Sequence, residues 1–141
     1  MEPITTAKLE DGALVVVDSA PIIYCLEGHA TLARRFRPIF DRHASGRMSF
    51  AVTTITIAEV LTGPLLAGDE ALAERYRAVL TSWYVIELTA EIAATAARLR
   101  AALKLKLPDA VQAASALAVN ADALVTHERD FSRLTALRVL G

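Results

Sequence analysis

The sequence predicts a single α/β domain with a mostly parallel central β-sheet of four to five strands flanked by α-helices. Short apolar runs rich in β-branched residues alternate along the chain with longer segments of helical periodicity, as in βαβ units. The run at 13–17 is apolar without alternation, which is typical of a strand buried on both faces of a parallel sheet. The 141 residues, 54% of them hydrophobic, suffice for one domain with its own core.

Composition excludes several classes of protein. The formal net charge of -1 argues against binding to nucleic acid through bulk charge alone. No apolar run approaches the roughly 20 residues of a membrane span, and residues 1–12 lack the pattern of a signal peptide. The single Cys25 cannot form an internal disulfide. We therefore expect a cytoplasmic protein of one domain, 1–141, in which residues 1–12 form an N-terminal extension that can be flexible.

The first half of the chain is predicted to contain two strands and three helices. Asp18 ends the first strand, and Pro21 suits the first turn of the helix that follows. Pro38 is expected to split or kink the second helix. The predicted elements are a strand at 13–17, a helix at 22–26, a helix at 31–40, a strand at 47–52 and a helix from Thr56 to Gly63–Pro64.

The second half continues the alternation of helices with short strands. Thr89 is placed to cap a helix, and Pro108 begins another that is rich in alanine. The predicted elements are a helix at 69–83, a strand at 84–88, a helix after Thr89, a helix at 109–119, a strand at 123–125, a helical turn at 131–134 and a last strand at 137–140.

Four carboxylates fall where a strand or loop meets a helix: Asp18, Glu59, Asp109 and Asp130. Each also has a purely structural interpretation. Asp18 and Asp130 suit helix N-caps, the latter for the turn at 131–134, and Asp109 suits the positive end of a helix dipole. Glu59 completes a capping box that begins at Thr56, with Ile55 and Val60 as a hydrophobic staple.

The four acids together favour a functional interpretation, because the carboxyl ends of parallel strands form the usual ligand crevice. Carboxylates that converge there repel one another, so at least one pKa should rise unless a cation neutralises them. Oxygen ligands without a His or Cys cluster select Mg²⁺ or Mn²⁺ rather than Zn²⁺. Such ions can clamp a phosphodiester and activate water.

The chain resembles the PIN-domain ribonucleases, in particular the VapC-type toxins of bacterial toxin–antitoxin pairs. Four segments carry the likeness, and they occur in the order found in that family. They are LVVVDSAPIIY at 14–24, TITIAEVL at 54–61, LPDAVQAASA at 107–116 and LVTHERDF at 124–131.

The resemblance implies a PIN-like fold with a metal-dependent endoribonuclease site. Asp18, Glu59 and Asp109 match the three most regular acids of the family, and Asp130 matches the fourth. Glu128 stands where the family often has Asp or Asn, so it is expected to share or replace the role of Asp130. Asp18, Glu59, Asp109 and Asp130 are expected to be catalytic and to bind Mg²⁺ or Mn²⁺, and Glu128 is a further candidate ligand of the ion. Thr126 and Ser19 are expected to support the site.

The resemblance also implies a mechanism and partners. Water attacks phosphorus in line and leaves a 3′-hydroxyl and a 5′-phosphate, so no protein nucleophile is needed. RNA is the expected substrate, and a cognate VapB-type antitoxin is expected to inhibit the enzyme by covering the site. The toxin is expected to form a homodimer.

Other interpretations follow from the same residues. A catalytically silent PIN-like module that only binds RNA or a partner is the main alternative. Receiver domains and Asp-x-Asp phosphatases fit less well, because Ala20 stands where a second acid belongs. The clusters Arg34–Arg35–Arg37 and Arg42–His43–Arg47 are candidates for RNA phosphates, or else form a solvated helix face. His127, beside the last acids, is either a surface residue or an RNA contact.

Overall fold

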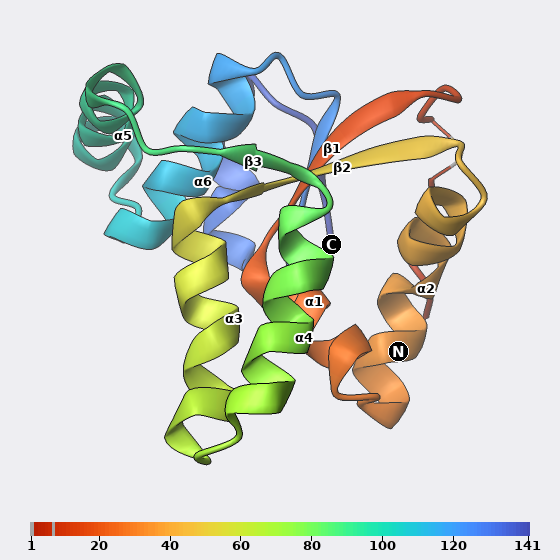
Figure 1. The fold of residues 1–141 in the computed structure, drawn as a ribbon. Coiled ribbons are helices and arrows are strands. Elements are labelled where there is room, and N and C mark those ends of the chain that lie inside the picture. The colour runs from red at the N-terminus through yellow and green to blue at the C-terminus, as the bar shows by residue number, and fades with distance from the viewer. Residues whose placement is uncertain (1, 7) are drawn as a thin grey trace.

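The computed structural model describes residues 2–6 and 8–141, and in this part of the chain five strands form one sheet (Figure 1). The strand order is β3-β2-β1-β4-β5, and every neighbouring pair is parallel. The strands are β1 (Ala13–Val17), β2 (Met48–Thr53), β3 (Tyr84–Ile86), β4 (Ala123–Val125) and β5 (Val139–Leu140). The predicted α/β class with a parallel sheet is therefore confirmed, and β1 occupies the centre.

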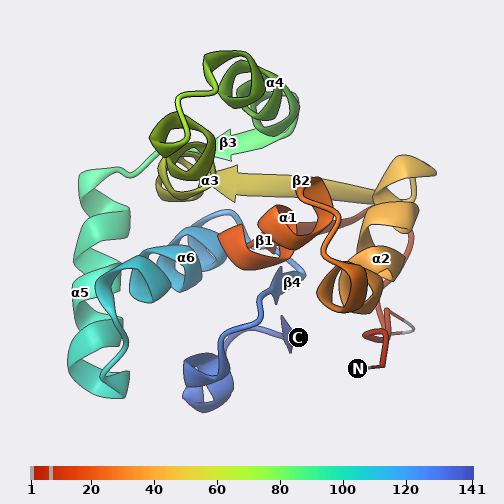
Figure 2. The same ribbon diagram turned by 90° about the horizontal axis from the view of Figure 1, so that it is seen from below.

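Helices cover both faces of the sheet (Figures 1 and 2). The helices are α1 (Ser19–Leu26), α2 (Ala30–Ala44), α3 (Thr54–Leu66), α4 (Glu70–Thr81), α5 (Ala90–Leu103), α6 (Leu107–Ala118) and the 3₁₀ helix η1 (Arg129–Arg133). Figure 1 shows α3 and α4 as an antiparallel pair that projects from the sheet. Within the described residues, no helix combines the length and the hydropathy that crossing a membrane requires.

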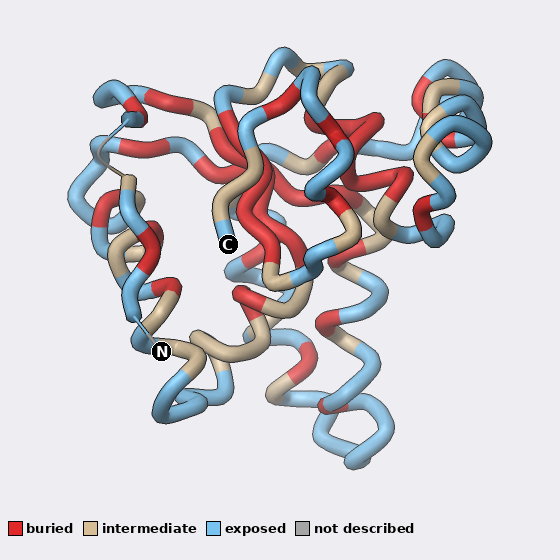
Figure 3. The backbone as a smooth tube through the Cα atoms, turned by 180° about the vertical axis from the view of Figure 1, so that it is seen from behind, coloured by how far each residue is buried: buried red, intermediate tan, exposed pale blue. Residues whose placement is uncertain are grey.

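The core consists of two apolar clusters, one on each face of the sheet. Val15 and Val17 of β1 belong to the cluster formed with α1 to α4, whereas Val16 between them belongs to the cluster formed with α5, α6 and η1. This assignment follows from the alternation of side chains along a strand, with both faces buried as the continuous apolar run predicts. Figure 3 shows the buried strands at the centre of the molecule. The central strands are thus held firmly, and the residues that follow them are fixed in place.

Two helices run through prolines at which the sequence predicts a break. α2 spans Ala30–Ala44 with Pro38 inside it, and α3 extends to Leu66 beyond Gly63–Pro64. In α2 the missing N–H leaves the carbonyl of Arg34 without its helical partner, but Arg34 is exposed, so water can reach that carbonyl. Phe36 and Ile39 are fully buried and hold this helix against the core. Tertiary contacts therefore outweigh the local cost of proline.

The remaining boundaries differ from the prediction by a few residues. β2 ends at Thr53 instead of Val52, and β3 ends at Ile86 instead of Leu88. The last strand is shorter than predicted and begins at Val139. Thr89 caps α5 as predicted, since its hydroxyl accepts a hydrogen bond from the N–H of Ile92 at 3.2 Å.

The described residues of the N-terminal segment lie against the domain. Ile4 and Leu9 are buried in the cluster that contains α2. The buried guanidinium of Arg42 donates hydrogen bonds to the carbonyls of Thr6 (2.8 Å) and Leu9 (2.5 Å) and pairs with Asp11 at 3.3 Å. Arg42 is therefore buried and engaged by the chain itself, so it fits neither of the two interpretations of its cluster, contact with RNA phosphate or a solvated helix face.

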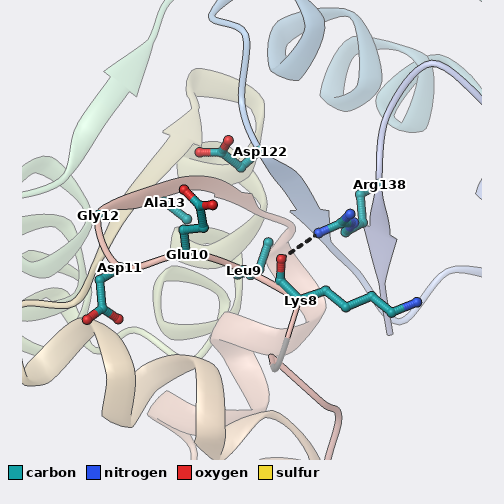
Figure 4. A pocket seen from close by; sticks show the side chains of 8 residues that line it. All are labelled: Lys8, Leu9, Glu10, Asp11, Gly12, Ala13, Asp122 and Arg138. Atoms are coloured by element: carbon teal, nitrogen blue, oxygen red, sulfur yellow. Dashed lines mark hydrogen bonds between the residues drawn. The ribbon is translucent and has the colours of Figure 1, made fainter.

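A pocket of about 410 Å³ opens beside the start of β1, at the edge of the sheet opposite the strands' carboxyl ends (Figure 4). Asp122 and Arg138 line it together with residues 8–13, and Arg138 donates a hydrogen bond to the carbonyl of Lys8 at 3.0 Å. Asp122 accepts a hydrogen bond from the N–H of Leu14 at 2.8 Å. This pocket is separate from the predicted site. The hydrogen bonds of Arg138 and Asp122 connect the residues around it to the starts of β4 and β5.

Candidate active site

Four of the five acids named by the sequence share one pocket of about 240 Å³ at the carboxyl end of the central strands. Asp18 lies at the junction of β1 with α1, Glu59 on α3, Asp109 on α6 and Glu128 after β4. The residues that line the pocket are Asp18, Ser19, Ala20, Tyr24, Glu59, Asp109, His127 and Glu128. The expected convergence of distant acids at this edge of the sheet is therefore observed.

Asp18 is the most firmly held of these acids. Its main-chain N–H donates to the carbonyl of Val125 at 2.8 Å, which extends the β1–β4 ladder by one residue. Its carboxylate Oδ1 accepts from the N–H of Ser19 at 2.8 Å, so Asp18 caps α1 as predicted. Its Oδ2 accepts from the hydroxyl of Thr126, also at 2.8 Å. Asp18 is therefore a helix cap and a pocket residue at once, and only 8% of its surface is exposed.

Glu59 is not part of a capping box. α3 begins at Thr54, and its N-cap is Thr53, whose hydroxyl accepts from the N–H of Thr56 at 3.1 Å. Glu59 is thus the sixth residue of the helix instead of the third, too far along to reach the cap, and the proposed staple of Ile55 with Val60 is also wrong. Partial burial and the charge of Asp18 raise the pKa of Glu59, and a hydrogen bond from the side chain of Ser19 offsets part of the increase.

Asp109 lies in the first turn of α6, directly after Pro108, as predicted. Its Oδ2 is buried and has no hydrogen-bond partner among the described residues. Burial, followed by the charges of Asp18, Glu128 and Asp130, raises the pKa of Asp109 to about 6, although Lys106 acts in the opposite direction. A buried, unpartnered carboxylate oxygen beside other acids is costly unless a cation accepts its charge.

Glu128 and Asp130 both lie near Asp109. One carboxylate oxygen from each of these three residues falls within 4.8 Å of the others. Glu128 also caps η1 by accepting from the N–H of Arg129 at 3.1 Å, so the prediction that Asp130 is the N-cap of a turn at 131–134 is wrong. The helical turn begins at Arg129, directly after this cap. Both acids remain available to a bound ion.

Thr126 links two of the acids through one hydroxyl. It is buried, donates to Asp18 and accepts from the N–H of Glu128 at 2.9 Å. The hydroxyl therefore fixes the distance between the end of β1 and the loop that follows β4. Ser19 contributes its N–H to Asp18 and its side chain to Glu59.

Sequence reasoning missed a buried polar network beneath the pocket. Gln112 on α6 contacts Asp18, Thr53 and Thr56 by hydrogen bonds of 2.5 to 2.8 Å. The available signal was the polar Gln112, three residues after Asp109 and flanked by the apolar Val111 and Ala113. A residue at that spacing shares a helix face with Asp109.

A second pocket, of about 390 Å³, adjoins the acidic one and shares His127 and Glu128 with it. Arg35 and Arg129 line this neighbouring pocket. Arg35 is partly engaged, because it donates hydrogen bonds to the carbonyls of Glu2 and Gly141. His127 lies between the two pockets, with its ring edge-on to Tyr24 at 5.6 Å and to Phe36 at 5.9 Å between centroids.

The residues of the acidic pocket fit a hard divalent cation. The group formed by Asp109, Glu128 and Asp130 offers only carboxylate oxygens, which Mg²⁺ and Mn²⁺ prefer. The unpartnered Oδ2 of Asp109 supplies a ligand atom that no protein donor satisfies. Burial, and after it the charges of the neighbouring acids, raise the pKa of Asp109, and a bound cation would act against both effects.

Among protein families, the PIN domain matches residues 15–137. The chain belongs to the PIN domain family. This PIN domain covers nearly the whole chain and includes every acid of the pocket, so the family suggested by the four sequence segments is confirmed. No curated protein matches the sequence.

Solved structures share the fold of this PIN domain. A chain of a toxin–antitoxin complex from Klebsiella pneumoniae has a TM-score of 0.70 and 25% identity, over 87% of this chain and 94% of that one. VapBC-1 from nontypeable Haemophilus influenzae has a TM-score of 0.70 and 24% identity, over 89% and 96%. VapC20 from Mycobacterium tuberculosis, a toxin that cleaves the sarcin–ricin loop, has a TM-score of 0.63 and 18% identity, over 88% and 98%.

Proposed function

We propose that this PIN domain is a metal-dependent endoribonuclease and the toxin of a toxin–antitoxin pair. The observation that carries the proposal is the pocket that gathers Asp18, Glu59, Asp109 and Glu128 from four separate segments of the chain. Membership of the PIN domain family and the likeness to toxins of known structure support it.

Asp109, Glu128, Asp130 and Asp18 would hold Mg²⁺ or Mn²⁺. When bound, the ion would polarise the phosphodiester and stabilise the charge that develops on its oxygens. Asp109 contributes a buried oxygen that already lacks a donor, and Glu128 and Asp130 lie beside it. The nearby N–H and hydroxyl donors hold Asp18 in one orientation, so it needs little rearrangement to bind.

Glu59 would serve as a general base and would not be a main ligand of the ion. It is not one of the three grouped carboxylates, and it lies on α3, where the charge of Asp18 acts on it. Its raised pKa brings the carboxylate closer to the range in which a general base works, so it is suited to accept the proton of the attacking water. Ser19 would orient this carboxylate through its side chain.

RNA would extend from the acidic pocket into the neighbouring one. Arg129 lines that pocket, and its guanidinium makes no hydrogen bond or ion pair with the described residues, which suits contact with a phosphate next to the scissile bond. His127 at the boundary of the two pockets offers a ring edge and a hydrogen-bond donor to the same strand.

The proposed activity is tested by incubating purified protein with total RNA, with and without Mg²⁺ or Mn²⁺, and mapping the ends. We expect cleavage only with the ion, with 5′-phosphate and 3′-hydroxyl products. Asp109→Asn should reduce the rate by more than about a hundredfold, because it removes a ligand of the ion. Asp122→Asn, an acid at the opposite edge of the sheet, is the matched control and should cleave normally.

Two results would contradict this function. Cleavage by Asp109→Asn at the normal rate would show that Asp109 has no role in the reaction. Binding of RNA without cleavage in either ion would instead favour the catalytically silent module.

We also propose a VapB-type antitoxin and a second copy of the chain as partners. The support is the likeness to toxin–antitoxin complexes and a set of exposed apolar side chains on the projecting pair of helices. That set is Leu65, Leu66 and Val79. Light scattering should give a dimer, and an antitoxin supplied in excess should abolish cleavage. A fully active monomer that no antitoxin inhibits would contradict both partners.

A further inference from the structure

Gln112 carries a polar amide at a buried position whose neighbours along the helix are apolar. It lies on α6 with only 1% of its surface exposed, between Val111 and Ala113, which are also buried. Burying an amide without partners is costly, so each of its polar atoms must be satisfied. All of its partners lie on segments that carry an acid of the pocket.

Chemistry fixes the orientation of the amide. The carboxylate of Asp18 only accepts hydrogen bonds, so the group that faces its Oδ1 at 2.8 Å must be the NH₂ of Gln112. The second hydrogen of that NH₂ reaches the hydroxyl of Thr56 at 2.5 Å. The amide oxygen accepts from the hydroxyl of Thr53 at 2.8 Å. Every hydrogen-bonding atom of the amide is therefore used.

This arrangement decides which oxygen of Asp18 is free. Oδ1 accepts from the N–H of Ser19 and from Gln112, which uses both of its lone pairs. Oδ2 accepts only from Thr126 and keeps one lone pair. Because Asp18 lines the acidic pocket, Oδ2 is the atom that remains for an ion there.

The amide also joins three acid-bearing segments. Asp18 ends β1, Thr53 and Thr56 form the first turn of α3 that leads to Glu59, and Gln112 shares α6 with Asp109. A shift of any one segment would break a hydrogen bond to the other two. The side chain of Gln112 thus connects the three segments that carry Asp18, Glu59 and Asp109.

We propose that Gln112 is a positioning residue that turns Asp18 so that Oδ2 faces the ion and holds the segments of Asp18, Glu59 and Asp109 in register. It does not touch the ion or RNA, because it is buried beneath Asp18. The proposal rests on the proposed metal-dependent function and adds a residue outside the acidic set.

The test is calorimetric titration of Mn²⁺ into RNA-free protein. Gln112→Met keeps the volume of the side chain and removes its hydrogen bonds, so the Kd for Mn²⁺ should rise about tenfold or more. The matched control is Ser115→Ala on the same helix, where a buried hydroxyl has no partner among the described residues. That variant should bind Mn²⁺ as the parent protein does.

A second variant covers the case in which Gln112→Met fails to fold. Thr56→Val keeps the shape of the side chain and the N–H that Thr53 caps, but removes one partner of the amide. We expect its Kd for Mn²⁺ to rise by roughly threefold, less than for Gln112→Met, because Gln112 keeps Thr53 and Asp18.

The outcomes separate the two proposals. If the parent protein binds Mn²⁺ and Asp109→Asn loses it, but folded Gln112→Met and Thr56→Val bind it unchanged, the role of Gln112 is overturned and the function stands. If the parent protein binds no Mn²⁺ in a manner that depends on Asp109, the function fails and the inference fails with it.

Discussion

Asp109 is the acid of the pocket whose ionised form is most destabilised by burial and by its neighbours. Its Oδ2 is buried without a partner, and three other acids face it. Selection for folding alone would replace such a group, because an amide of the same shape carries no charge to bury. Its presence is best understood as a ligand kept at the expense of stability, as is common at functional sites.

The metal-free protein should become less stable as the pH rises through the titration of Asp109. The folded protein holds the proton of this carboxyl up to about pH 6, whereas the unfolded chain releases it near pH 3.9. Between these values the folded state binds more protons, so the free energy of unfolding falls with increasing pH. Asp109→Asn should remove this loss and be about 1 kcal/mol more stable at pH 7, after allowance for solvent screening.

Urea denaturation at pH 4 and pH 7 without divalent ions measures the difference. Asp122→Asn, a substitution in the far pocket, keeps Asp109, so it should differ from the parent protein by the same free energy at both pH values. An equal effect of Asp109→Asn at both pH values would show that its charge is already compensated. Addition of Mn²⁺ at pH 7 should stabilise the parent protein and leave Asp109→Asn unchanged.

At the scale of elements, the first turn of α3 decides where Glu59 lies. Thr53, Thr54 and Thr56 are all possible caps in the sequence, and local pattern alone favours Thr56 because Glu59 follows three residues later. The structure differs because Thr53 pairs with Ile86 of β3 and is the last residue of β2. α3 therefore begins at Thr54, with Thr53 as its N-cap. This long-range contact has no trace in a local motif.

The N-cap residues Thr53 and Thr89 should contribute different amounts to the free energy of unfolding. Thr53→Ala removes the cap of α3 and also leaves the amide oxygen of Gln112 without a donor, so it should destabilise the protein by about 3 kcal/mol. Thr89→Ala removes only an exposed cap of α5 and should cost about 1 kcal/mol. Thermal or urea unfolding of both variants compares them, and equal losses would mean that Thr53 is no more than a cap.

Much of the site could be predicted because its acids stand at junctions between elements. Strand ends and helix starts are visible in hydrophobic periodicity, and parallel strands bring those ends to one edge. Asp18, Glu59 and Asp109 were predicted in this way, whereas Glu128 was suggested only by the family resemblance. Gln112 could not be assigned, since its role depends on which side chains from β1 and α3 face α6.

At the scale of the whole molecule, three arginines join the N-terminal segment to the domain: Arg35, Arg138 and the buried Arg42. Arg42 reaches the carbonyls of Thr6 and Leu9 from α2, while Ile4 and Leu9 enter the core. Hydrogen bonds from a buried charged group are among the stronger ones. The segment precedes the family match, yet it belongs to the folded unit.

Arg42→Met should therefore release this segment. Loss of the buried guanidinium leaves two carbonyls without donors and should lower the free energy of unfolding by about 3 kcal/mol. Limited proteolysis should then cut within residues 2–12 while the rest resists digestion. Arg77→Met, which breaks only an exposed ion pair with Glu74, is the control and should change stability by less than about 0.5 kcal/mol. Unchanged resistance in Arg42→Met would show that the apolar contacts suffice.

The order of the strands has a consequence for the cell that makes this chain. Asp18 and its partner Thr126 are separated by 108 positions, so the pocket cannot close until the ribosome has translated β4 and let it emerge beside β1. A nascent polypeptide therefore lacks the complete acidic pocket, and with it the proposed activity, until β4 has paired with β1. The order of the strands thus delays assembly of the site to the end of synthesis.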